Sequence, residues 1–355
     1  MKHGHWEYRS TIMESVITFR RALLFWLFLT LLLSLLAAAA RAGEATERFT
    51  ALEENDSLYF HVDRHYTQGV RFSYTSAEVE DDSSWDAPFD ILGGIPGFFP
   101  DGGKRRTTAI LGQSFFTPED IARNPPDPTD RPYAGWLYGG AGLLEESGGP
   151  VSTLENAEIL LGVVGPDAFG EEVQNDYHQL IDAKRANGWD SQLKNEPGVM
   201  LSYERYWRVP VTGGWLDVVP RAGATVGNVM TYGQAGALLR LGNALGADYG
   251  PIRIRPALSG TDYFDGAALP KAFGYYVYAG AVGRVVGLNI FLDGNSFRKS
   301  PSVEKKTFVA DIEGGFALFF WEIVKLDFSV VGRSEEFDGQ DGPDVIGTAS
   351  LSAMW

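Results

Sequence analysis

Short stretches in which apolar and polar residues alternate run through most of the sequence. The alternation is clearest in residues 70–75, 201–208, 308–320 and 326–333. Successive side chains of a β-strand point to opposite faces, so a period of two predicts strands with one apolar and one polar face. A chain built from many such stretches is expected to be all-β.

The polar faces of these stretches carry charge, and the stretches are long. Asp311, Glu313 and Asp327 occupy polar positions, and residues 308–320 exceed the roughly 9–11 residues that a tilted strand needs to cross a bilayer. A soluble β-sandwich has the same alternation. Length together with charge on one face favours a transmembrane antiparallel barrel with a polar interior.

The end of the sequence supports a barrel. One face of the last stretch is formed by Gly347, Ala349, Leu351, Ala353 and Trp355, and the chain ends on that aromatic residue. Outer-membrane barrels commonly end in this way, although an amphipathic last strand of another β protein has the same pattern. Because single-chain bacterial barrels have even numbers of strands, we predict twelve.

The N-terminal residues 1–42 have the pattern of a cleaved signal peptide. A basic pair at positions 20 and 21 precedes the apolar run 22–36, and an A-x-A cleavage pattern follows at 40–42. The alternative is an uncleaved membrane anchor, for which the apolar segment is just long enough. We favour cleavage because small residues end the run and no basic stop-transfer cluster follows.

Residues 43–355 are predicted to form one outer-membrane barrel domain. The chain contains no cysteine, so an exported protein of this length needs a large core or a closed barrel for stability. Its formal net charge is −16 at pH 7. This charge argues against nucleic acid as a partner, because phosphate binding needs a basic face.

Residues 170–190 have helical rather than β periodicity. An apolar stripe is formed by Val173, Tyr177, Leu180 and Ile181. On a neighbouring face, Gln174, His178 and Asp182 follow one another at intervals of four. We predict a short helix inserted into the barrel, with a basic end at Lys184 and Arg185 that suits the helix dipole.

Histidine is the side chain best suited to act as a base near neutral pH, and the predicted mature chain has only three. His61 and His65 lie near a strand start and are interpreted as solvated surface residues. His178 is the better candidate for catalysis, because a helix holds it between an amide and a carboxylate. The sequence lacks a G-x-S-x-G elbow, an H-E-x-x-H motif and a P-loop.

Several blocks, in order, resemble the lipid A 3′-O-deacylase family of Gram-negative outer membranes. They are END (54–56), DRHYTQG (63–69), GQSFFTPEDI (112–121), DRPYAGWLY (130–138), GVVGPDAFGEEVQNDYHQLI (162–181), GWDSQLKNEPG (188–198), GNVMTYGQAGALLRLG (227–242), LNIFLDGNSF (288–297) and EEFDGQ (335–340).

The resemblance implies a twelve-stranded barrel in the bacterial outer membrane. Its site would lie between the barrel wall and a short helix, and Ca²⁺ would be required to hydrolyse the ester that carries the 3′ acyloxyacyl group of lipid A. Matching the family's motifs residue by residue gives these site residues: Asn55, Asp56, Thr67, Gln174 and His178. The partners implied are lipopolysaccharide and outer-membrane lipid, and a monomer is expected.

The family pattern also sets two expectations outside these blocks. A basic residue that contacts substrate in the family falls, by loose alignment, at Arg123. An acidic residue six positions after the catalytic histidine is replaced here by Lys184, so Asp182 would have to take its place if that acid orients the imidazole.

The expected mechanism uses His178 as the general base on a water molecule. Ca²⁺, held partly by Asp56, would polarise the ester carbonyl, while Asn55, Thr67 and Gln174 position metal, water or imidazole. Thr67 as a covalent nucleophile is a minor alternative. Two other functions stay open: a non-catalytic barrel or channel, and a Ca²⁺-dependent outer-membrane phospholipase.

Overall fold

A computed structural model describes residues 46–56, 64–80, 83–100, 102–254 and 261–355. The predicted signal peptide, 1–42, and His61 lie outside the described residues.

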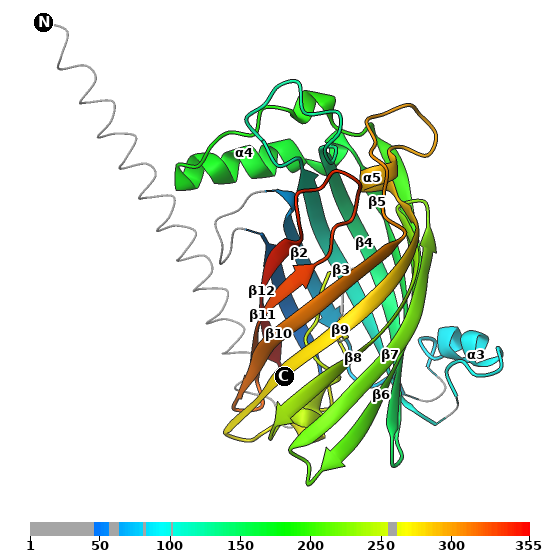
Figure 1. Ribbon diagram of the computed structural model, residues 1–355. Helices are drawn as coiled ribbons and strands as arrows, with labels where there is room; N and C mark the ends of the chain where they lie inside the picture. The colour runs from blue at the N-terminus through cyan, green and yellow to red at the C-terminus, as the bar shows by residue number, and fades with distance from the viewer. Residues whose placement is uncertain (1–45, 57–63, 81–82, 101, 255–260) are drawn as a thin grey trace, which may run out of the picture.

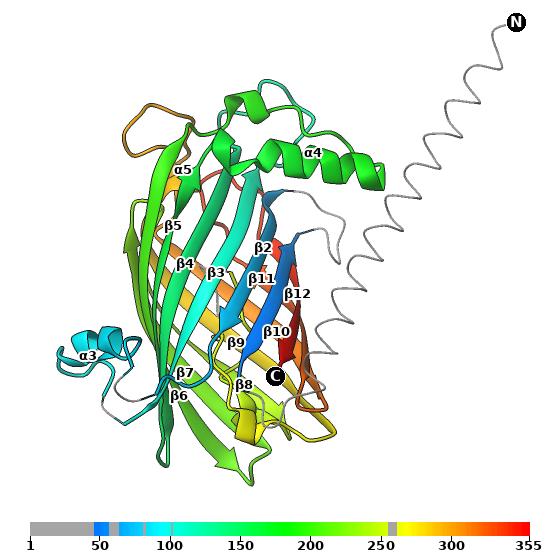
Figure 2. The same ribbon diagram turned by 180° about the vertical axis from the view of Figure 1, so that it is seen from behind.

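Twelve antiparallel strands close into a barrel, each paired with its neighbours in sequence and the first paired with the last (Figures 1 and 2). The predicted fold class and strand number are confirmed. The strands are β1 (Arg48–Asn55), β2 (His65–Thr75), β3 (Lys104–Thr117), β4 (Ala134–Ser147), β5 (Ser152–Val164), β6 (Glu196–Thr212), β7 (Leu216–Gly227), β8 (Met230–Gly242), β9 (Phe273–Asn289), β10 (Phe308–Phe320), β11 (Val324–Arg333) and β12 (Asp344–Met354).

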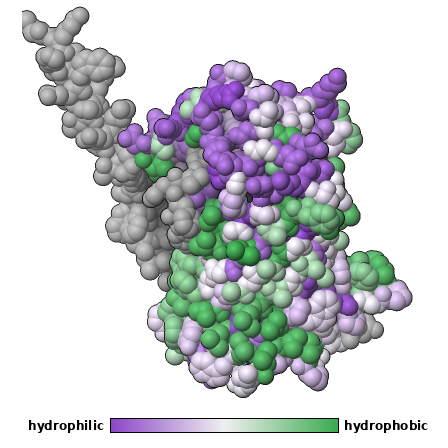
Figure 3. Space-filling model, in the orientation of Figure 1, coloured by the Kyte–Doolittle hydropathy of each residue, from purple (hydrophilic) through white to green (hydrophobic). Residues whose placement is uncertain are grey.

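The alternation in sequence becomes an inner and an outer face of the wall. In β10, Phe308 and Ile312 are 75% and 67% exposed on the outside, whereas Asp311 and Glu313 are buried in the interior. The space-filling view has an apolar surface around the lower part of the barrel and a hydrophilic upper end (Figure 3). This distribution suits a barrel wall surrounded by lipid, with one end in water.

Paired charges occupy the barrel interior. The carboxylate of Asp311 accepts hydrogen bonds from Arg284 at 2.8 and 2.9 Å and from Arg333 at 3.0 and 3.1 Å. The connection between β8 and β9 enters this interior, where the guanidinium of Arg253 pairs with Glu54 of β1. Burying a charge is costly unless it is paired, so these contacts let a polar interior be packed rather than hollow.

The two longest helices lie outside the wall, at opposite ends of the barrel. The longest is α4 (Gly170–Ile181), which crosses the end opposite to the C-terminus, and α3 (Ala87–Gly93) lies beside the other end (Figure 1). The remaining short helices are η1 (Pro166–Ala168), η2 (Trp189–Ser191), η3 (Leu245–Ala247), η4 (Gly266–Ala268) and α5 (Ile290–Asp293). In the described part of the chain, no helix combines the length and apolar character that a membrane span requires.

The chain ends close the barrel. β12 pairs with β1 from Arg48 opposite Met354 to Asn55 opposite Gly347. Beyond the strand, the backbone N–H of Trp355 donates to the carbonyl oxygen of Glu47 at 3.1 Å, and its own carbonyl accepts from Thr46 at 2.7 Å. The last residue therefore extends the seam on which closure depends.

We predict that Trp355→Asp impairs barrel assembly, because a charge is placed at the lipid-facing end of the closing seam. Most of the folded, heat-modifiable band should be lost from outer-membrane fractions on gel electrophoresis. Trp321→Asp is the control, since Trp321 is 64% exposed in the turn between β10 and β11 and outside the pairing of β1 with β12. Equal folded yields for both variants would count against the special role of the last residue.

Candidate functional site

The helix α4 lies with its polar face against the barrel. Gly170, Gln174 and His178 are its buried residues, and their spacing of four puts them on one helical face. A glycine is needed at position 170, because a Cβ atom there would lie 2.5 Å from the ring of Trp189. The helix thus approaches the wall closely enough to bury two polar side chains.

The apolar stripe of the same helix is exposed. Val173, Tyr177 and Ile181 are 36%, 44% and 43% exposed, Leu180 is half-buried, and Phe169, just before the helix, is 53% exposed. A water-soluble protein normally has the opposite arrangement, with the apolar face inward. An exposed apolar stripe on a helix beside a lipid-facing wall is the pattern of a helix that lies in a membrane interface.

The helix is shorter than its sequence pattern predicted. It ends at Ile181, and Asp182 follows in the left-handed region with φ of 62°. Lys184 and Arg185 therefore lie beyond the helix instead of in its last turn. The expectation that Asp182 continues the face of Gln174 and His178 was wrong for the same reason.

A cavity of about 200 Å³ lies between this helix and the outer face of β1 and β2. All five residues matched to the family's catalytic motifs line it: Asn55, Asp56, Thr67, Gln174 and His178. The wall side of the cavity also includes Gln68 and Phe115, and the helix side includes Tyr177 and Ile181. Segments more than 100 positions apart in the sequence thus meet in one small space. Both the wall and the helix contribute polar and apolar side chains to its lining.

A β-bulge brings Thr67 to the cavity. In the pairing of β2 with β3, Tyr66 lies opposite Phe116 and Gln68 opposite Phe115, so Thr67 has no partner of its own. The extra residue lets Tyr66 point inward, where its hydroxyl donates to Glu54 at 3.0 Å, while Gln68 points outward. Bulges of this kind often reorient side chains beside functional sites.

The imidazole of His178 is fixed by the backbone that follows the helix. Its Nδ1 is hydrogen-bonded to the carbonyl oxygen of Lys184. A carbonyl can only accept, so this bond requires the proton of the neutral ring on Nδ1 and leaves the ring lone pair on Nε2. A backbone oxygen at position 184 thus takes the orienting place that we had expected for the carboxylate of Asp182, which is exposed.

The amide of Gln174 is held by Trp189, which the sequence analysis did not identify as a site residue because its side chain is largely apolar. The Nε1–H of Trp189 donates to Oε1 of Gln174 at 2.8 Å, which turns the amide nitrogen away from the indole. The buried indole also packs edge-on against Phe115, with ring centroids 6.2 Å apart. The only sequence signal for Trp189 was its place in the matched block 188–198.

Asp56 follows directly after β1 and ties this strand to β2. Its carboxylate accepts a hydrogen bond from the backbone N–H of Arg64. Among the described residues, no three acidic, histidine or cysteine side chains cluster as a metal site would require. The cavity still offers oxygens from Asp56, Asn55 and Thr67, and such hard donors suit Ca²⁺, which also accepts backbone carbonyls and water.

His65 is not the solvated residue that we predicted. It is 1% exposed, and its Nδ1 is 2.8 Å from the carboxylate of Asp344 while its Nε2 is 3.4 Å from that of Asp130. Burial disfavours ionisation of Asp130, yet hydrogen bonds from His65 and backbone N–H groups lower the pKa of that carboxyl. His65 thus joins β2 to the loop before β4 and to the start of β12.

Arg123 lies outside the cavity. Its side chain is 49% exposed in the connection between β3 and β4, where it forms an ion pair with Asp127. Hydrogen bonds from Thr129 and from Arg123 lower the pKa of Asp127 to about 2. The predicted substrate contact is therefore near the rim of the same end of the barrel rather than among the residues that line the site.

We predict that His65→Ala destabilises the barrel by roughly 1–3 kcal/mol, because the buried carboxylate of Asp344 loses one partner but keeps Arg64 at 3.3 Å. The shift should appear in urea unfolding monitored by the heat-modifiable band. Arg123→Ala removes an exposed ion pair from the neighbouring loop and should cost less than about 1 kcal/mol. A His65→Ala variant as stable as Arg123→Ala would show that the two carboxylates do not need the imidazole.

Comparison with known proteins gives a match of the sequence to a family model and a match of the structure to a solved barrel. The family model described as "Outer membrane protein LpxR" matches residues 24–355. The solved structure of LpxR from Salmonella typhimurium superimposes with a TM-score of 0.68 at 21% identity, covering 87% of this chain and 100% of that chain. A search of curated proteins gives no match.

Weaker structural similarity extends to domains of two autotransporters. The beta domain of the Bordetella autotransporter BrkA has a TM-score of 0.41 at 10% identity, covering 88% of this chain and 99% of that one. The translocator domain of NalP from Neisseria meningitidis has a TM-score of 0.38 at 11% identity, covering 98% of each chain.

Proposed function

This chain belongs to the LpxR family of outer-membrane proteins, and we propose that it is a lipid A deacylase that hydrolyses the 3′-linked acyloxyacyl ester. One observation carries the proposal. The side chains that match the family's catalytic motifs, from β1, β2 and α4, line a single cavity on the outer wall of the barrel. A site on that wall is open to a lipid substrate arriving sideways from the bilayer.

The surroundings of the cavity support a substrate that is partly embedded in the membrane. Tyr177 and Ile181 belong both to the cavity lining and to the exposed apolar stripe of α4. Below the cavity, Phe72 and Leu111 of the lipid-facing wall are 40% and 57% exposed. An ester held near Asn55 and His178 would thus have apolar surface on two sides for its acyl chains.

In the proposed mechanism, Nε2 of His178 removes a proton from a water molecule as that water attacks the ester carbonyl. The hydrogen bond from Nδ1 to the carbonyl of Lys184 keeps the proton off Nε2 beforehand and stabilises the imidazolium that forms. The imidazolium then returns the proton to the alkoxide of the sugar as the ester bond breaks. The products are the free acyloxyacyl acid and a lipid A with a 3′ hydroxyl.

The neutral polar side chains are assigned to positioning. The amide nitrogen of Gln174, turned away from Trp189, can donate to water or to the developing oxyanion, and Asn55 offers a second amide. The hydroxyl of Thr67 is hydrogen-bonded to that of Thr117 at 2.7 Å. This bond favours Thr67 as a positioning residue over its role as a covalent nucleophile, which needs a hydrogen bond to the base.

Ca²⁺ is proposed as the cofactor, with Asp56 as its carboxylate ligand and the oxygens of Asn55 and Thr67 beside it. When bound, the ion supplies charge that polarises the ester carbonyl and stabilises the oxyanion. Because Asp56 is the one carboxylate in the described lining of the cavity, we expect moderate affinity, completed by backbone oxygens, water or substrate. Arg123 is proposed to bind a headgroup phosphate, which would replace Asp127 as the partner of its guanidinium.

Of the two alternative functions, a channel is disfavoured by the filled interior, whereas a phospholipase is compatible with the same cavity. A channel needs an open lumen, whereas Arg253 and Asp262, from the connection between β8 and β9, are buried and paired with charges of the barrel wall. A phospholipase would use the same cavity and the same base. Purified protein offered phospholipid and lipid A side by side distinguishes these two substrates.

We predict that His178→Ala inserts and folds normally but loses about two to four orders of magnitude in ester hydrolysis, the usual contribution of a positioned general base. The measurement is the rate of lipid A deacylation by mass spectrometry, with folding checked by heat-modifiability. Asp182→Asn is the matched control on the same helix end, and it should stay close to wild type because the Lys184 carbonyl orients the ring. Wild-type activity in His178→Ala would contradict this mechanism.

We also predict that activity disappears in excess EDTA and returns with added Ca²⁺. Asp56→Asn keeps the size of the side chain but removes its charge, so it should raise the Ca²⁺ concentration needed for half-maximal rate at least about tenfold, since ligand charge tunes Ca²⁺ affinity. Glu119→Gln, a change in an exposed carboxylate of the same barrel end, is the control. Undiminished turnover in chelator would remove the metal from the mechanism.

A further inference from the structure

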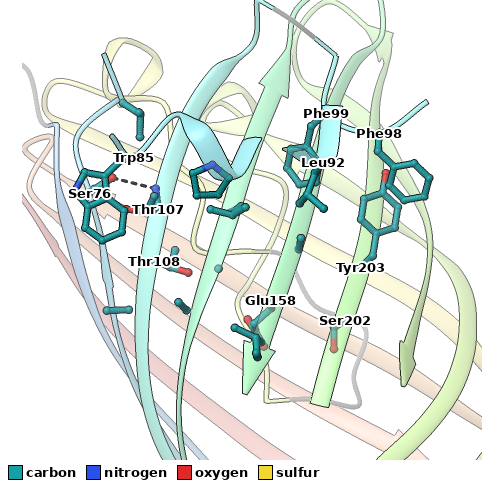
Figure 4. A pocket seen from close by; sticks show the side chains of 18 of the residues that line it. Ser76, Trp85, Leu92, Phe98, Phe99, Thr107, Thr108, Glu158, Ser202 and Tyr203 are labelled. Carbon is teal, nitrogen blue, oxygen red and sulfur yellow. Dashed lines mark hydrogen bonds between the residues drawn. The ribbon is translucent and has the colours of Figure 1, made fainter. Parts of the chain in front are cut away.

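A second and larger hollow lies at the other end of the barrel, on its outer surface. It encloses about 1190 Å³ between the wall of β3 to β7 and the segments 76–80 and 83–100, the second of which contains α3 and is called the α3 segment (Figure 4). Small-molecule pockets typically measure about 300–1,000 Å³, so this groove can take a larger, lipid-sized molecule. It is separate from the catalytic cavity and shares no residue with it.

Apolar and mostly small residues in register form the wall side of the groove. Ala109 of β3 pairs with Ala141 of β4, and Leu143 of β4 pairs with Ala157 of β5. Larger side chains border this hollow on the side of β6, where Tyr203 meets Phe98 of the α3 segment with ring centroids 4.6 Å apart. Figure 4 shows Leu92, Phe98 and Phe99 grouped at that border.

The α3 segment is fixed to the wall by a row of outward-facing charges. Arg105 of β3 binds Asp86 at 2.7 Å and Asp90 at 3.0 Å, both from the segment, and Glu145 of the neighbouring strand at 2.7 Å. On β5, the carboxylate of Glu155 accepts the backbone N–H of Phe99. Without this cover, a row of charged side chains would face lipid, so these contacts hold the α3 segment against the wall.

The charged side chains that line the groove are all acidic. Its described lining includes Glu47, Glu78, Glu80 and Glu158, and no lysine, arginine or histidine is among these residues. Glu158 points into the barrel, where Arg71 binds it at 3.3 Å. Glu47 directly precedes β1, and Glu78 and Glu80 follow β2, toward the barrel end that carries residue 355. A headgroup held there would meet carboxylates.

The orientation of the barrel identifies the leaflet. The end that carries residues 46 and 355, the first and last described residues, also carries the short turns 148–151, 213–215 and 321–323, as the periplasmic end of outer-membrane barrels does. Trp85 and Ile91 of the α3 segment are 66% and 74% exposed there. Exposed tryptophan at this level is typical of a membrane interface.

We propose that this groove binds one phospholipid of the periplasmic leaflet whose headgroup carries a primary amine. Its acyl chains lie along the alanine-lined wall, which continues the lipid-facing surface, and its ammonium meets Glu47, Glu78 and Glu80. A zwitterionic amine lipid is preferred over an anionic one, because the lining offers Glu47 and Glu80 in addition to Glu78, whose carboxylate already lies 3.8 Å from the guanidinium of Arg106. The inference depends on the outer-membrane location and not on the proposed deacylase activity.

The test uses the full mature chain reconstituted in vesicles of phosphatidylethanolamine and phosphatidylglycerol in equal amounts, then extracted in mild detergent for native mass spectrometry. Wild type should retain one phosphatidylethanolamine per barrel. Ala141→Trp fills the groove with an apolar side chain and should reduce retention at least about fivefold. Ala281→Trp adds the same side chain to an exposed, outward position of β9 and should retain lipid as wild type does.

Charge is tested separately by replacing Glu47, Glu78 and Glu80 together with glutamine. The preference for phosphatidylethanolamine over phosphatidylglycerol should fall at least about threefold, while the total lipid retained stays similar. The proposal is overturned if no lipid is retained, if Ala141→Trp and Ala281→Trp retain it equally, or if phosphatidylglycerol is held as well as the amine lipid. A dimer mass lost in Ala141→Trp would instead identify a second copy of the chain as the occupant.

Discussion

The constraint on which this structure depends is that lipid cannot satisfy a backbone hydrogen bond. Every N–H and C=O group of a membrane-spanning strand must bond within the protein, and a closed sheet is the way in which strands achieve this. Pairing of β1 with β12 removes the last free edges. Once the sheet is closed, alternate side chains must face lipid and lumen, so the apolar surface and the charged interior follow from the same geometry.

This geometry also explains why the candidate site is outside the barrel. The interior is filled by ion pairs and by the connection between β8 and β9. The outer wall is therefore the surface that a lipid can contact. There, α4 covers Asn55 and Thr67 with Gln174 and His178, while its apolar stripe remains exposed. A helix with its polar face inward is stable at this place because a membrane can solvate the other face.

The barrel was predictable from sequence because alternation with a period of two repeats in every strand and needs no long-range information. The site was predictable only through blocks of family resemblance, since Asn55 and His178 are far apart in the chain and nothing local joins them. Three details depended on tertiary contacts that no pattern reveals. They are the left-handed turn that ends the helix at Asp182, the carbonyl of Lys184 that replaces a carboxylate, and the burial of His65 between two aspartates.

The central claim is that a cavity on the outer wall of this barrel hydrolyses one particular ester of lipid A. The most direct measurement is tandem mass spectrometry of lipid A from Gram-negative cells that express the chain, compared with cells that carry the empty vector. The account predicts a lipid A that lacks the 3′-linked acyloxyacyl group and is otherwise intact. Unchanged lipid A in cells with correctly folded barrel, or loss of an acyl chain from another position, would contradict it.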